Sequence, residues 1–141
     1  MTREYSMRRA IVRALAELGA FPVENSVHAG TPDVAFAGGW IELKRLEAWP
    51  KRPTTIVKPG LSPKQRQWLA RHAKAGGQGF VLLRVDAAWL LFLATDAVKI
   101  LDSTTRSELE RWRQGQWHGR GAAAGIRDWF LARFNRQSAS L

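Results

Sequence analysis

The chain has 141 residues, 45% of them hydrophobic, which is enough to bury the core of one globular domain. Its formal net charge of +10 favours a polyanionic partner, and no apolar run is long enough to span a membrane. The lack of cysteine excludes disulfides and thiolate zinc sites, and the histidines lack the spacing of metal ligands. The N-terminus shows no apolar stretch typical of a secretory signal, so we expect one domain over residues 1–141 without a membrane partner.

The first predicted element is an amphipathic helix over residues 3–18. Apolar residues recur there at the spacing of one helix face, at Met7, Ala10, Ile11, Ala14, Leu15 and Leu18. Gly19 is placed to end this helix as a C-cap. Glu4 lies two turns before Ile11 and projects near the apolar stripe, whereas Glu17 projects away from it beside Arg13. A preference for acids in a first helical turn also explains Glu4, so its role stays open.

A strand is predicted over residues 21–27, and a β-hairpin follows it. Gly38-Gly39 is a favoured two-residue turn, which would set Asp33 opposite Lys44. Because side chains alternate along a strand, Asp33, Glu42 and Lys44 would then share one face of the hairpin. The other face is apolar and suits a core, with Val34, Phe36, Ile41 and Leu43.

Two carboxylates and an ammonium on one face suggest a metal site. Asp33 and Glu42 offer only oxygen ligands, which suits Mg²⁺, an ion that accepts a phosphate oxygen as a further ligand. Such an ion can polarise a phosphodiester, and Lys44 could orient the attacking water or offset charge on the phosphate. The small side chains of Ala35 and Ala37 would leave room for a ligand. The alternative is an ordinary cross-strand ion pair on a solvated hairpin, worth less than ~1 kcal/mol.

A loop rich in proline and basic residues is predicted over residues 45–60. Its residues suited to contact with a nucleic-acid backbone are Trp49, Lys51, Arg52 and Lys58. Trp49 could stack on a base or ribose, or it could cover the edge of the core in a solvated connector.

A second helix begins at Ser62, with Pro63 at the first helical position and Gln65 completing a capping box. Gln65 shares a helix face with Leu69 and so points inward, where capping and a role in a site compete for one side chain. Lys64 lies on another face and could meet a nucleic-acid backbone.

The remaining segments extend this α/β pattern. Residues 80–83 are apolar throughout, as in a strand buried on both faces, and residues 89–94 and 98–101 are predicted to be further strands. A short helix capped by Ser103 or Thr104 would carry Leu109 and Trp112. A last helix over residues 126–134 carries aromatic residues suited to a core or a dimer interface. Residues 102–141 would thus form a helical extension of a core over residues 1–101.

Together, several of these residues resemble a known family. Pro32-Asp33 followed by Glu42-Leu43-Lys44 is similar to the signature of the PD-(D/E)xK nucleases. With Gly30 before it and Leu61-Ser62-Pro63-x-Gln65 after it, the set resembles the VRR-NUC and phage Holliday-junction-resolvase-like branch. The resemblance implies a restriction-endonuclease-like αβββαβ core with a mixed central sheet flanked by helices.

The activity that this resemblance implies is metal-dependent endonucleolytic hydrolysis of DNA, on duplex or branched substrates. It places Asp33, Glu42 and the Leu43 carbonyl on Mg²⁺, with Mn²⁺ able to substitute, and makes Lys44 catalytic, with Gln65 near it. A third acid is expected from Glu4 on the first helix or from Glu24, which lies in a Val-Glu-Asn segment. The choice between them is open.

Two other functions remain on the same fold. One is a non-catalytic DNA-binding accessory module that uses only the basic surface, and the other is cleavage of RNA. The sequence also leaves open a homodimer that makes paired cuts. The phage-like resemblance suggests the cytoplasm of a bacterium or of a phage-infected host cell.

Overall fold

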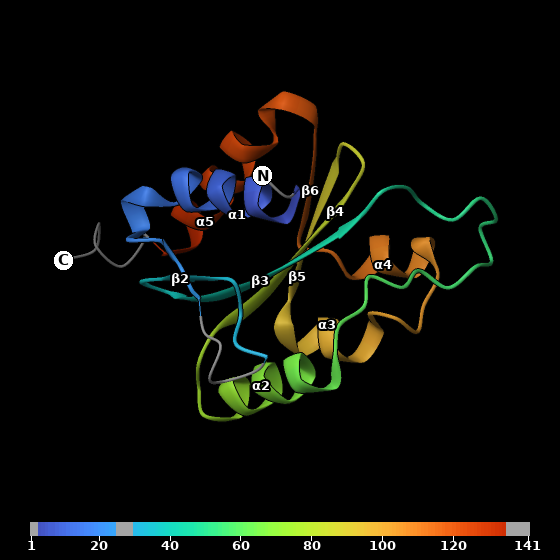
Figure 1. Cartoon of the computed structure of the whole chain (residues 1–141), viewed down its shortest axis with the longest axis horizontal. Coiled ribbons are helices and arrows are strands. Elements are labelled where there is room, and N and C mark those ends of the chain that lie inside the picture. Colours follow the sequence, from blue (N-terminus) through green and yellow to red (C-terminus); the bar gives the residue numbers. More distant parts are fainter. Residues whose placement is uncertain (1–2, 25–29, 135–141) are drawn as a thin grey trace.

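One mixed sheet organises the fold (Figure 1). The computed structural model describes residues 3–24 and 30–134, with side chains from residue 6 onward. The strands, in chain order, are β1 (Phe21–Pro22), β2 (Val34–Phe36), β3 (Gly39–Leu46), β4 (Gly79–Val85), β5 (Ala88–Leu93) and β6 (Gly115–His118). They form a 6-stranded sheet in this same order. Strands β3 and β4 run parallel, and the other neighbours are antiparallel.

Helices cover both faces of the sheet. They are α1 (Arg3–Ala14), α2 (Pro63–Lys74), α3 (Ala94–Ile100), α4 (Arg106–Trp112) and α5 (Ala122–Phe134), with 3₁₀ turns η1 (Ala16–Leu18) and η2 (Gly119–Gly121). Figure 1 shows α1 and α5 on one side of the sheet and α2 and α3 on the other, so the core has two layers. The expected α/β class is confirmed. None of the described helices is both long and apolar enough to cross a membrane.

The N-terminal helix follows the prediction closely. Met7, Ile11 and Leu15 are at most 1% exposed and pack against the sheet. The predicted last turn is the separate 3₁₀ turn η1, and Gly19 ends it in the left-handed conformation at φ +71°. Of the strand predicted over residues 21–27, β1 covers the first two residues, and residues 25–27 lie outside the described residues.

The β2–β3 hairpin forms, but its turn differs from the predicted Gly38-Gly39. Phe36 pairs with Gly39, so the two loop residues are Ala37 and Gly38. Gly39 begins β3 instead, and a Cβ there would lie 2.1 Å from the backbone oxygen of Gln78. The glycine is therefore required by a close approach of two backbones rather than by the turn.

The prediction of a strand over residues 98–101 is wrong, because these residues belong to helix α3 and its C-cap. Ala94, Ala97 and Leu101 are all at most 3% exposed and follow a helical spacing, and their small or flexible side chains let α3 pack against the sheet. The hydroxyls of Ser103 and Thr104 both donate to the Ile100 carbonyl at the end of α3. Neither residue caps the next helix, because the N-cap of α4 is residue 105.

The C-terminal segment is more than a helical extension. It contributes β6, which pairs with β5 at the edge of the sheet. It also contributes α5, whose Phe130 is 0% exposed and lies in edge-to-face contact with Phe36 and Phe80 at 5.3 Å and 5.1 Å. Residues 102–134 therefore complete the sheet and the α1-side core.

We expect Phe130→Ala to lower the free energy of unfolding by about 3–5 kcal/mol, because it empties the centre of this core. Phe21→Ala is a matched control, since that ring is 55% exposed on the edge strand. It should cost less than about 0.5–1 kcal/mol. Urea unfolding followed by circular dichroism measures both values, and equal costs would contradict the packing of α5.

Candidate functional site

The β2–β3 ladder brings two carboxylates together. The ladder ends at the pair Val34–Ile41, and its register continued by one residue would set Asp33 opposite Glu42, not opposite Lys44 as predicted. The predicted register of the hairpin is wrong by two residues, and because this shift is even, every side chain stays on its predicted face. Opposed Cβ atoms of adjacent strands lie about 4.5–5.5 Å apart, so the two acids are neighbours. Lys44 follows Glu42 by two residues along β3, so its side chain lies on the same face.

Glu42 is buried on the face that α2 covers. It pairs in register with Val81 of β4, which belongs to the α2-side core. Among the described residues, Glu42 is the one polar or charged residue that is buried, at 2% exposure. A buried carboxylate is costly unless hydrogen bonds or positive charge compensate it. This position is therefore unusual for a residue that served only the fold.

Gln65 from α2 reaches this carboxylate. Its Nε2 donates to Glu42 Oε1 at 2.7 Å, while its Oε1 accepts from the backbone N–H of Ser62 at 2.9 Å. The Ser62 hydroxyl accepts from the Gln65 backbone N–H at 3.1 Å, which completes the predicted capping box. The amide has a donor and an acceptor, so the two competing roles are filled at once by opposite ends of one side chain.

Gly30 explains how Asp33 comes to lie beside α2. Its φ is +90°, and a Cβ on it would lie 2.5 Å from the backbone oxygen of Lys64. Pro32 is buried in the same segment. The chain before β2 therefore packs directly on the first turn of α2, and only glycine permits that approach.

Asp33 also sets the local backbone of β3. Its Oδ2 accepts from the Leu43 backbone N–H at 2.8 Å. In an extended strand, the N–H and C=O of one residue point to the same edge, so the Leu43 carbonyl points to the side on which Asp33 lies. That orientation is compatible with the metal-ligand role expected for this carbonyl.

Lys44 is half-buried, and its Nζ donates to the carbonyl oxygen of Gly60 at 2.9 Å. Gly60 lies at the end of the loop over residues 47–62, just before α2. The ammonium is therefore held at the rim of the site, on the face shared by Asp33 and Glu42.

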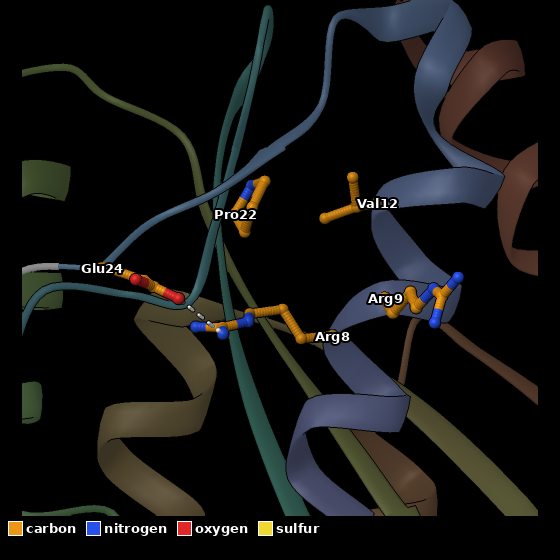
Figure 2. Close-up of a pocket in the computed structure, with 5 residues that line it drawn as sticks. All are labelled: Arg8, Arg9, Val12, Pro22 and Glu24. Carbon is orange, nitrogen blue, oxygen red and sulfur yellow. Dashed lines mark hydrogen bonds and ion pairs between the residues drawn. The ribbon is translucent and has the colours of Figure 1, made fainter. Parts of the chain in front are cut away.

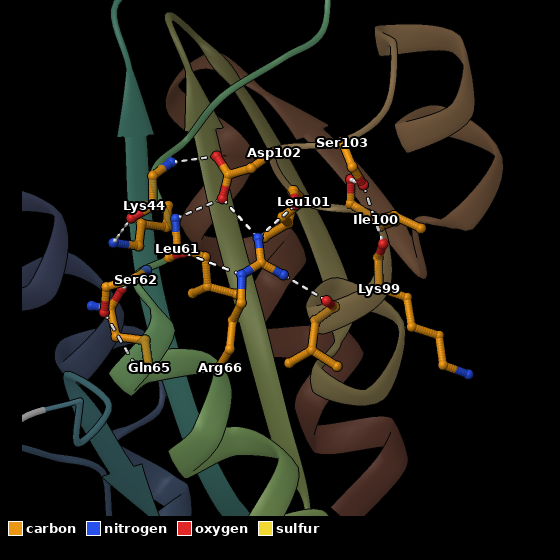
Figure 3. A network of polar contacts seen from close by, with 12 residues as sticks. Lys44, Leu61, Ser62, Gln65, Arg66, Lys99, Ile100, Leu101, Asp102 and Ser103 are labelled. Atoms are coloured by element: carbon orange, nitrogen blue, oxygen red, sulfur yellow. Dashed lines mark hydrogen bonds and ion pairs between the residues drawn. The ribbon is translucent and has the colours of Figure 1, made fainter.

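A polar network that the sequence did not indicate fixes the end of this loop (Figure 3). Asp102 accepts from the backbone N–H groups of Gly60 and Leu61 at 2.7 Å and 2.9 Å. It also accepts from Arg66 at 2.9 Å, and Arg66 donates to the carbonyls of Leu61, Val98 and Leu101. The network thus joins α2, the end of α3 and the loop that holds the Lys44 partner.

The local signal for Asp102 is its backbone conformation. Its φ is +69°, directly after α3, and aspartate tolerates this left-handed region better than most residues. The half-buried side chain of Arg66 holds the start of α2 and the end of α3 together.

The structure places Glu24 apart from Asp33 and Glu42. The Val23 N–H donates to the Asp33 carbonyl at 2.8 Å, which extends the β1–β2 ladder and puts Val23, not Glu24, on the face of Asp33. Glu24 pairs with Arg8 of α1 at 3.2 Å, and its side chain is 78% exposed. Both residues line a hollow of about 150 Å³ over α1 and β1, and Figure 2 shows their charged ends pointing toward each other.

The other candidate for the third acid is not described. The Glu4 side chain lies outside the described residues, although its backbone is in α1. Among residues 6–24 and 30–134, His, Asp and Glu side chains form no group of 3 or more that could hold a metal ion. The described part of the site therefore offers two acids and a backbone carbonyl.

Aromatic side chains line the same face of the sheet. Trp40 lies two residues before Glu42 and meets Trp68 of α2 at 5.0 Å, and Trp68 stacks on His72 at 4.8 Å. Burial lowers the pKa of His72, so its ring is neutral near pH 7. These three rings pack on one another between β3 and α2, and no sequence motif singled them out.

The predicted basic residues are all exposed. Lys51, Arg52 and Lys58 lie on the loop and Lys64 on the first turn of α2. Trp49 is half-buried against the α2-side core, with the Arg106 guanidinium 4.4 Å from its ring centre. Trp49 thus matches the alternative in which it covers the core edge, and its ring supports a cation.

No family model matches this sequence, and no curated protein matches it either.

Asp102→Asn should loosen the loop beside Lys44, because the charged acceptor of two backbone N–H groups and Arg66 becomes a neutral amide. Asparagine tolerates the positive φ, so strain does not confuse the result. We expect faster hydrogen exchange at Gly60 and Leu61 and a loss of about 1–3 kcal/mol in unfolding free energy. Asp128→Asn, at a side chain 68% exposed, is the control and should leave both unchanged. Unaltered exchange at Gly60 and Leu61 would contradict the anchoring role.

Proposed function

We propose that the protein is a Mg²⁺-dependent endodeoxyribonuclease with a restriction-endonuclease-like core. The observation that carries this proposal is the buried Glu42 carboxylate, which accepts from Gln65 on the strand that Asp33 contacts at the next residue, Leu43. The motif order, which resembles that of the PD-(D/E)xK nucleases, supports the same chemistry. A purely structural hairpin would not require an acid at 2% exposure.

The donor set fits a hard divalent cation. Asp33, Glu42 and the Leu43 carbonyl would hold Mg²⁺ or Mn²⁺, since all three offer oxygen. When bound, the ion neutralises phosphate charge and makes a bound water more acidic. A positive charge between two neighbouring carboxylates would also stabilise the buried one. Glu4 is the candidate for a further acid, because Glu24 faces α1 and pairs with Arg8.

The chain's own residues would orient the reaction. Gln65 holds the Glu42 carboxylate through one oxygen and so fixes the direction of the other. Lys44 carries a positive charge at the rim of the site, where it would bind a phosphate oxygen or position the attacking water. Its bond to Gly60 places the ammonium before substrate arrives, which reduces the reorganisation needed for the reaction.

The basic surroundings suit a nucleic acid. Lys58 and Lys64 are exposed on either side of the Gly60 turn that meets Lys44. With the net charge of +10, they would draw a polyanion toward a site that is itself acidic. A DNA-binding module without catalysis would need the cations but not the buried acid.

Asp33→Asn and Lys44→Ala should each lower the rate of Mg²⁺-dependent cleavage by about 100-fold or more, because each removes a charge that acts on the reacting phosphate. Lys74→Ala, an exposed cation at the far end of α2, is the control and should cut normally. The assay uses labelled linear, branched and single-stranded DNA, and an RNA of the same sequence, with Mg²⁺ or with EDTA. Undiminished cutting by either site variant, or no metal-dependent cutting by the native chain, would refute the proposal.

Two substitutions separate capping from the site. Ser62→Ala removes only the cap and should cost about 1 kcal/mol of stability while the cleavage rate is kept. Gln65→Ala also removes the bond to Glu42, so cleavage should fall about tenfold or more or need higher Mg²⁺. If the two variants cleave at equal rates, measured well below their melting temperatures, Gln65 caps the helix and has no role in cleavage.

A further inference from the structure

The loop after β3 and helix α4 enclose a second basic hollow, separate from Asp33 and Glu42. Its volume is about 300 Å³, and its polar lining is Lys51, Arg52, Thr55, Arg106, Ser107 and Glu110. Figure 1 shows the long loop running beside α4 on the side of the molecule away from α5. Arg106, Ser107 and Thr55 belong to no motif in the sequence.

This hollow is built on an anchored part of the loop. Val57 is 1% exposed in the α2-side core, and its N–H donates to the Thr104 carbonyl at 2.9 Å, just before α4. The Thr55 N–H donates to the Arg52 carbonyl at 3.1 Å and closes a turn. Pro50 and Pro53 restrict the chain further. The loop therefore presents Lys51 and Arg52 from a defined backbone.

Arg106 is held in place before any ligand binds. Its guanidinium lies over Trp49 at 4.4 Å, and its Nε pairs with Glu110 at 3.3 Å. A guanidinium stacked on an aromatic ring keeps donors in its plane, where they suit the paired oxygens of a phosphate. Trp49 thus supports the Arg106 guanidinium, and this face of its ring is covered rather than open to a base.

The charges favour an anion. Lys51, Arg52 and Arg106 bring three positive charges against the single negative charge of Glu110, and two hydroxyls supply further donors. We infer that this hollow binds one backbone phosphate of the nucleic acid, away from the phosphate that is cut. The inference rests on the proposed nuclease function for the identity of the polyanion.

The shared loop explains why this phosphate belongs to the same substrate. The segment that lines the hollow runs on to Gly60, whose carbonyl accepts from Lys44. A strand held at both places would be fixed in direction across the site. The chain would then use one phosphate for chemistry and a second for position, without reading any base.

The test measures affinity by fluorescence anisotropy, with the full chain in EDTA so that no DNA is cut. A labelled duplex, an RNA duplex and single-stranded DNA are titrated at several salt concentrations. Arg106→Ala and the double variant Lys51→Ala/Arg52→Ala should weaken duplex DNA binding roughly three- to tenfold and flatten the salt slope by about 0.9 per lost phosphate contact. Glu110→Gln should tighten binding, because it removes the one negative charge of the hollow. Lys99→Ala, an exposed cation on α3, is the control and should change neither quantity.

The outcomes separate this inference from the proposed function. If affinity and salt slope are unchanged in both Arg106→Ala and the double loop variant, the hollow does not bind a phosphate, even if the chain cuts DNA. If these variants weaken binding but the native chain never cuts DNA, phosphate binding in the hollow is supported and the proposed nuclease function is refuted. Because Arg106→Ala also removes the cover of Trp49, the double loop variant, whose side chains are exposed, decides the result if Arg106→Ala unfolds. Equal losses with RNA support recognition of the phosphate backbone itself.

Discussion

The burial of the Glu42 carboxylate is the constraint around which the polar structure of this chain is arranged. Strand β3 is paired on both edges, which fixes the face to which the side chain points, and α2 covers that face. Gln65 meets it from α2, and the start of α2 is fixed by the capping box and by Arg66 and Asp102. The close packing of Gly30 on the first turn of α2 places Asp33 beside the same helix. Several separate features thus converge on one acid.

Local sequence rules predicted which side chains share a face of β3 better than they predicted the turn and the elements around it. The two-residue period of a strand placed Asp33 and Glu42 on one face, and that conclusion survived a wrong turn because the slip was even-numbered. The turn was wrong because Gly39 serves a backbone contact with Gln78, which only the folded chain creates. The same limit explains Asp102, whose partners lie about 40 residues away in sequence.

The C-terminal elements show a second limit. Residues 98–101 are too few for periodicity to separate a strand from a helix, and the alanines before them carried the missing signal. Strand β6 is short and lies at an edge, where only pairing with β5 defines it. Its neighbour α5 was correctly predicted as an aromatic helix, and the structure adds that its rings close the core. The same part of the chain supplies Arg106, so it bears on the proposed function as well as on stability.

Diffraction at the manganese absorption edge, from crystals grown with Mn²⁺, addresses the two acids most directly. We expect an anomalous peak coordinated by the carboxylates of Asp33 and Glu42, with the Leu43 carbonyl oxygen as a further ligand. A peak elsewhere, or none beside these residues at saturating Mn²⁺, would contradict it.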